Sequence, residues 1–173
     1  LHRENAEQLR PYNLEPPLWV MLGSSVNAMY RQDREARSDV AEVVAFFRRF
    51  LEDRAWAVRT IGKIRDGDSG FTDEQGHDLC EPYLRTLRDA DAKTVYEGIL
   101  DSVFHGAGAL EVWELKNADG ELGLRASSGK GEGGNYFGVI NIGDVSSFKK
   151  HLEEQLGIET QDDRFNPSQF EAV

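Results

Sequence analysis

The prediction of the fold starts from the segment Pro16-Pro17-Leu18-Trp19-Val20-Met21-Leu22-Gly23-Ser24-Ser25-Val26-Asn27. Its two prolines prevent an upstream helix from extending into the segment. Proline fixes its own φ, lacks an N–H and pushes the preceding residue out of the α region. The next five residues are apolar, and so short a run ending in Gly-Ser-Ser is typical of a strand buried on both faces. Such strands belong to parallel sheets covered by helices, so the sequence predicts an α/β fold.

The loop after this strand is the first candidate site. In helix-covered parallel sheets, ligands gather in the loops at the carboxyl ends of the strands. Here that loop is Gly23-Ser24-Ser25.

Composition places the chain among ordinary globular domains. Its 173 residues are 39% hydrophobic and 29% charged, which suits one domain with a real core. No apolar run approaches the ~20 residues of a membrane span, and the polar N-terminus lacks a secretory signal. A single cysteine, Cys80, excludes an internal disulfide and a thiolate zinc cluster. We therefore expect a cytoplasmic protein with no membrane partner and, because no initiator Met is present, one cut from a longer chain.

The net charge of −11 argues against tight nucleic-acid binding by this chain alone, since phosphate neutralisation supplies most of that affinity. Basic residues nevertheless gather in one region. They are either a solvated helix face interleaved with acids or a flank that faces nucleic acid in a larger assembly. The residues are Arg31, Arg34, Arg37, Arg48, Arg49, Arg54, Arg59, Lys63 and Arg65.

The region after Arg37 has helical periodicity. Asp39 with Glu42 forms a capping-box pattern, and apolar residues at steps of three and four predict one long helix that ends near Gly67. Two more helices are predicted over 79–89 and 93–105, the second capped by Asp91. The intervening loop, 66–78, resembles a calcium loop only superficially, because its acids lack the required spacing.

The pattern then changes from helical to alternating. Ala109–Leu115 and Leu122–Ala126 flank a turn at residues 117–120, which predicts a β-hairpin. The glycine-rich stretch 127–135 follows. It lacks the first glycine and the final hydroxyl of a phosphate-binding P-loop. It contains Gly-x-Gly-x-x-Gly, but a strand follows instead of a helix, which favours a connector.

The last part of the chain predicts a βαβ unit. Tyr136–Ile142 is its first strand, Gly143-Asp144 is the turn and helix cap, and a strand begins near Ile158 after Gly157 ends the helix.

Three segments in this order resemble one family. They are Asn13 to Asn27, Ser38-Asp39-Val40, and Tyr136-Phe137-Gly138-Val139-Ile140-Asn141-Ile142-Gly143-Asp144. Together they resemble the DEAD/DEAH-box helicase-like proteins related to the Res subunit of type III restriction enzymes. The resemblance covers nearly the whole chain.

The resemblance implies a partial RecA-like fold of the P-loop NTPase type, with a helix-covered sheet. Residues 1–37 would be an N-terminal arm and the first strand of the second RecA-like domain. Residues 38–135 would be a family-specific insertion of helices and a β-hairpin, and 136–173 a truncated βαβ continuation. The implied parent is an ATP-dependent superfamily-two DNA helicase or translocase, a hydrolase tied to restriction. It binds ATP and Mg²⁺ between two RecA-like domains of one chain.

The resemblance assigns this chain no catalytic residue, metal site or cofactor of its own. The Walker A loop, the Asp-Glu box and the later arginine motif that ATP hydrolysis needs are missing, so we expect no ATPase activity in isolation. What it carries over is nucleic-acid backbone contact by Gly23, Ser24, Ser25 and Asn27, with Gly143 and Asp144 as a second group. For both groups the alternative is purely structural: the first ends a strand, and Asp144 caps a helix.

The competing hypothesis is a non-catalytic protein-interaction module built on the acidic helical insertion. An independent small α/β enzyme is the third, and it lacks a nucleophile–base pair or metal set in the sequence.

Overall fold

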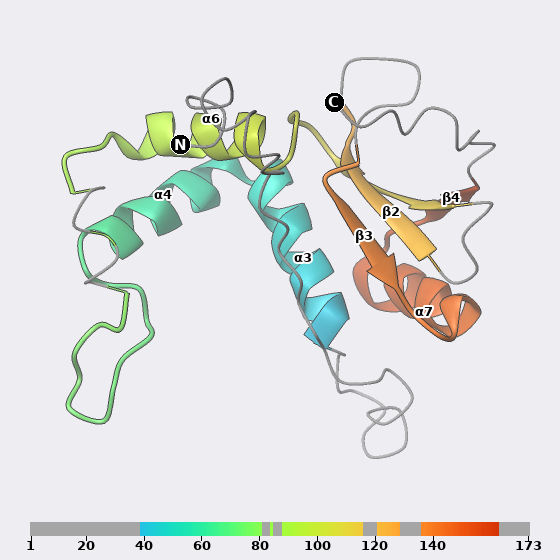
Figure 1. The fold of residues 1–173 in the computed structure, drawn as a ribbon, viewed down its shortest axis with the longest axis horizontal. Coiled ribbons are helices and arrows are strands. Elements are labelled where there is room, and N and C mark those ends of the chain that lie inside the picture. Colours follow the sequence, from blue (N-terminus) through green and yellow to red (C-terminus); the bar gives the residue numbers. More distant parts are fainter. Residues whose placement is uncertain (1–38, 81–83, 85–87, 116–120, 129–135, 163–173) are drawn as a thin grey trace, which may run out of the picture. The chain divides into compact units, whose positions relative to one another are not determined.

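The structure of the chain is a computed structural model that describes residues 39–80, 84, 88–115, 121–128 and 136–162 (Figure 1). A division of the chain falls between Asp39 and Val40, and apart from Asp39 all described residues belong to the second unit. That unit is mixed α/β, with helices and a four-stranded mixed sheet, which confirms the broad class predicted. The predicted strand 18–22 lies outside the described residues.

The region predicted as one long helix forms two. α3 spans Asp39–Glu52 and α4 spans Arg54–Arg65, so the prediction was right at both ends and wrong in the middle. The break is at Asp53, whose backbone leaves the helical region (φ −109°, ψ 77°). Its carboxylate accepts a 2.9 Å hydrogen bond from the Trp56 N–H, as an N-cap does. α4 therefore starts after Asp53, because the Asp53 carboxylate takes the place of a backbone carbonyl as the acceptor for the Trp56 N–H.

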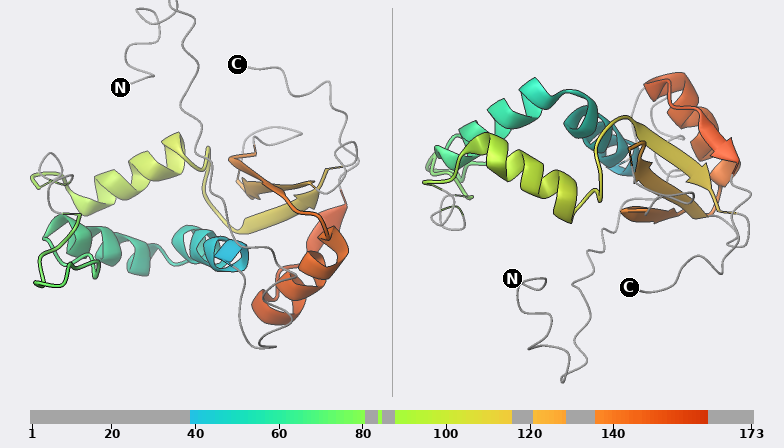
Figure 2. Two further views of the ribbon diagram at one scale, coloured as in Figure 1. Left: turned by 60° about the horizontal axis from the view of Figure 1, so that its bottom comes forward. Right: turned by 90° about the horizontal axis from the view of Figure 1, so that it is seen from above.

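α6 spans Ala92–Ser102 and runs alongside α4, as both views of Figure 2 show. Asp91 caps it, as predicted, by accepting the Thr94 N–H at 3.0 Å. The other predicted helix, 79–89, falls mostly outside the described residues. After α6 the chain turns through His105, whose φ is +53°, and leads into the sheet.

The predicted hairpin is confirmed. β1 (Leu110–Glu114) and β2 (Glu121–Ala126) pair antiparallel, with Val112 opposite Leu124. Their alternating residues divide as the sequence pattern requires. One face buries a set of apolar side chains: Leu110, Val112, Leu122, Leu124 and Ala126. The opposite face holds Glu111, Trp113 and Arg125.

β3 spans Gly138–Asn141, within the strand predicted for 136–142, and pairs antiparallel with β2. The strand order is β3-β2-β1-β4, which Figure 1 shows for the first three strands. One sheet therefore contains strands from both sides of the boundary predicted between residues 135 and 136.

The predicted βαβ unit is present, but its two strands are not neighbours. β3 leads into α7 (Val145–His151), a π-helical turn η3 (Leu152–Leu156) and β4 (Thr160–Asp162). β4 pairs parallel with β1, so it also runs parallel to β3 with β2 and β1 between them. Gly157 ends the helical segment with φ +61°, as the sequence predicts.

Side chains of α7 bind it to the sheet. Phe148 of α7 and Leu152 of η3 have no exposed surface, and the Lys149 ammonium group lies 2.6 Å from the Glu114 carboxylate of β1.

Two hydrogen bonds connect α3 to the rest of the unit. The Arg48 guanidinium of α3 donates to the Leu156 carbonyl, while the Leu110 N–H donates to the Glu52 carboxylate of α3 at 3.2 Å. α3 is thereby fastened to both the helical crossover and the start of β1.

Candidate functional site

The first predicted site lies outside the described residues. It comprises Gly23, Ser24, Ser25 and Asn27. Their proposed contact with nucleic acid stays a prediction.

The second predicted site, Gly143 and Asp144, is the turn between β3 and α7. The Asp144 carboxylate accepts the Ser147 N–H at 3.0 Å and the Ser147 hydroxyl at 2.8 Å. These hydrogen bonds, the backbone one first, lower the pKa of Asp144 below its usual value. Asp144 is therefore an ionised helix cap, the structural alternative for this residue. Gly143 borders open space, where backbone amides can approach a ligand.

The turn has the location that suits a ligand loop. It leaves the carboxyl end of β3, and β3 is parallel to β4 in the same sheet. Loops at this end of parallel strands are where ligands bind in α/β folds. A carboxylate repels phosphate, so within this turn a phosphate would be held by the backbone of Gly143 and not by the Asp144 side chain.

The two serines that precede the glycine-rich stretch have structural roles. The Ser127 hydroxyl accepts the Ala109 N–H at 2.9 Å, and the Ser128 hydroxyl accepts the Ala107 N–H at 2.8 Å. A Cβ on Gly108 would clash with Ser127 Oγ, and Gly108 has φ +100°. The serines therefore extend the hairpin at its base, and residues 129–135 lie outside the described part.

Carboxylates of the acidic loop after α4 accept hydrogen bonds from the loop's own backbone. Asp73 accepts the backbone N–H groups of Gln75 and His77 at 2.9 and 2.8 Å. Asp78 accepts the Ser69 N–H at 2.6 Å and the Cys80 N–H at 2.7 Å. Backbone hydrogen bonds led by that of His77 lower the pKa of Asp73. The Asp73 and Asp78 carboxylates therefore stabilise the turns of this loop.

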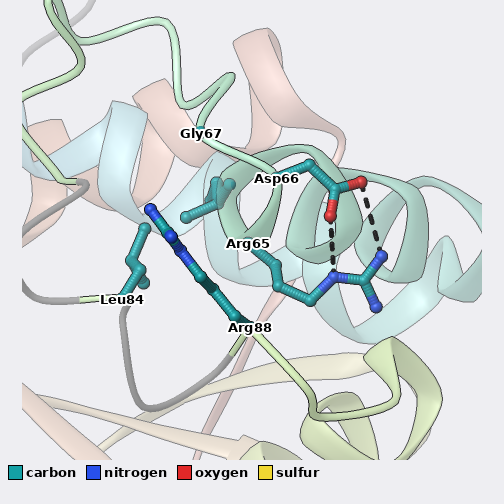
Figure 3. Close-up of a pocket in the computed structure, with 6 residues that line it drawn as sticks. Arg65, Asp66, Gly67, Leu84 and Arg88 are labelled. Atoms are coloured by element: carbon teal, nitrogen blue, oxygen red, sulfur yellow. Dashed lines mark hydrogen bonds and ion pairs between the residues drawn. The ribbon is translucent and has the colours of Figure 1, made fainter.

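A pocket of about 250 Å³ lies at the end of α4 (Figure 3). Its polar lining includes Arg65, Asp66 and Arg88, and Leu84 contributes an apolar wall. Arg65 pairs with Asp66 at 2.9 Å and donates to the Ala90 carbonyl at 3.1 Å. The side-chain hydrogen bond between Arg65 and Asp66 raises the pKa of the first and lowers that of the second.

The sequence did not predict this pocket, and the residues that line it are poorly suited to binding an anion. Most of the Arg65 charge is already matched by Asp66, and the negative end of the α4 dipole points toward the pocket. Both effects disfavour an anionic ligand. The only sequence signal was the pair of basic residues, Lys63 and Arg65, in the last turn of the helix.

Most basic side chains of α3 and α4 pair with acids or stack on rings. Arg54 reaches Glu97 at 2.9 Å, and Lys63 reaches Asp68 at 3.4 Å. The Arg49 guanidinium lies 4.3 Å from the centre of the Trp56 ring. This arrangement supports the interpretation of a solvated helix face interleaved with acids.

Among the described residues, no group of three or more His, Cys, Asp or Glu side chains could hold a metal ion. No helix in the same part of the chain has the length and apolarity to cross a membrane.

The chain was compared with family models, curated proteins and solved structures, and none of them matches it.

Proposed function

We propose that this chain is a non-catalytic segment of an ATP-dependent DNA translocase of superfamily two, related to the Res subunit of type III restriction enzymes. It contributes part of a RecA-like domain and contacts to the DNA backbone. ATP and Mg²⁺ are bound by other parts of the parent protein.

One observation carries the proposal. The segment Gly138–Asp144, which resembles the family most closely within the described residues, forms a strand and a helix-capping turn that lead into α7 and the parallel strand β4. A strand, turn, helix and parallel strand are the repeating unit of α/β nucleotide-dependent motors. In this proposal the antiparallel hairpin β1–β2, which lies between the two parallel strands, is a family-specific addition.

The proposed DNA contact uses backbone amides and small polar side chains. Gly23, Ser24, Ser25 and Asn27 supply hydroxyl and amide donors, and Gly143 supplies an unobstructed backbone. Donors of this kind position a protein on phosphate oxygens and do not distinguish between sequences. Such contacts suit a protein that moves along DNA.

DNA binding by the complete gene product tests this contact. We expect the combined substitution Ser24→Ala, Ser25→Ala and Asn27→Ala to weaken binding to labelled duplex DNA at least about tenfold, because hydrogen bonds to charged groups are each worth about 1.5–3 kcal/mol. The loss should be equal for unrelated DNA sequences.

The matched control is Ser102→Ala, which removes an exposed hydroxyl that donates to the Gly98 carbonyl within α6. It should leave DNA affinity unchanged. An affinity unaltered by the triple substitution, in a protein whose circular dichroism is that of the wild type, would refute the contact.

A further inference from the structure

We draw no further inference here: the strongest candidate, the exposed apolar pair Phe71 and Leu79 on the hairpin of residues 69–80 that follows α4, is a surface patch for which nothing in the described part of the chain shows what covers it.

Discussion

At the scale of single residues, Gly123 shows how a missing side chain shapes the sheet. A Cβ at this position of β2 would lie 2.6 Å from the Tyr136 ring and 3.1 Å from Leu115. Gly123→Ala should therefore displace the ring and lower the free energy of unfolding by about 1–3 kcal/mol, the usual cost of overpacking. The matched control is Gly138→Ala in neighbouring β3, where the new Cβ would meet Leu124 at an ordinary 3.7 Å. Urea denaturation of both variants checks this, and equal stabilities would contradict it.

Asp53 is the residue at which prediction from sequence failed. The apolar spacing runs on through residues 40–64, so periodicity alone could not reveal the break. The missed signal was an Asp three residues before Trp56, the spacing of an N-cap.

Asp53→Ala should cost about 1 kcal/mol of unfolding free energy, because the Trp56 N–H at the start of α4 loses its acceptor. Asp53→Asn should retain most of the stability, since an amide oxygen caps equally well. Thermal unfolding of the two variants measures the difference. A loss as large with Asn as with Ala would mean that charge, and not capping, is what matters at Asp53.

At the scale of elements, the start of α7 depends on an ionised Asp144. Its pKa is lowered in the folded state, so its hydrogen bonds stabilise the fold fully above the unfolded pKa of about 3.9. That contribution is lost as the pH falls through the folded value. Ser147→Ala removes the hydroxyl donor but keeps the backbone one, so the pKa of Asp144 should rise toward its ordinary value without reaching it.

A carboxyl-carbon NMR titration measures this change. Ser146→Ala serves as the control, because Ser146 is exposed and the Asp144 oxygens bond to Ser147 instead. An Asp144 pKa that is the same in all three proteins, or a fold that becomes more stable below pH about 4, would contradict the capping account.

Elements with a local signal were the ones that the sequence predicted well. The β1–β2 hairpin follows from alternation around a turn, and the caps Asp91 and Asp144 follow from residue type. Strand order has no such signal. β4 pairs with β1 and not with β3, and this choice depends on packing between segments far apart in the sequence. The βαβ unit could therefore be predicted, but not that β2 and β1 lie between its two strands.

At the scale of the whole described unit, aromatic rings join the helices to the sheet. Phe104, 3% exposed, follows α6 and contacts Phe47 of α3 and Phe137 just before β3, with ring centres 5.7 and 4.8 Å away. Phe104→Ala should lower the free energy of unfolding by about 3–5 kcal/mol. Phe46→Ala, at a half-exposed ring of α3, should cost clearly less. Guanidinium denaturation followed by circular dichroism compares them, and equal losses would mean that this cluster does not hold the unit together.

The candidate site could be predicted only in part. The turn and helix cap at Gly143 and Asp144 were predicted because a glycine and an acid after a strand mark a helix start, and the structure confirms the capping by Asp144. Their contact with nucleic acid stays a prediction. The exposed pair Phe71 and Leu79 could not be predicted, because sequence alone does not reveal which apolar residues stay in water.

We proposed above that the chain is part of a DNA-driven motor whose ATP site lies elsewhere in the protein. The most direct test of this proposal is the rate of ATP hydrolysis, measured with and without duplex DNA, for the complete gene product and for residues 1–173 alone. We expect hydrolysis that DNA accelerates in the complete protein and no hydrolysis by residues 1–173. A complete protein whose hydrolysis is absent or indifferent to DNA, or an active 1–173 chain, would contradict it.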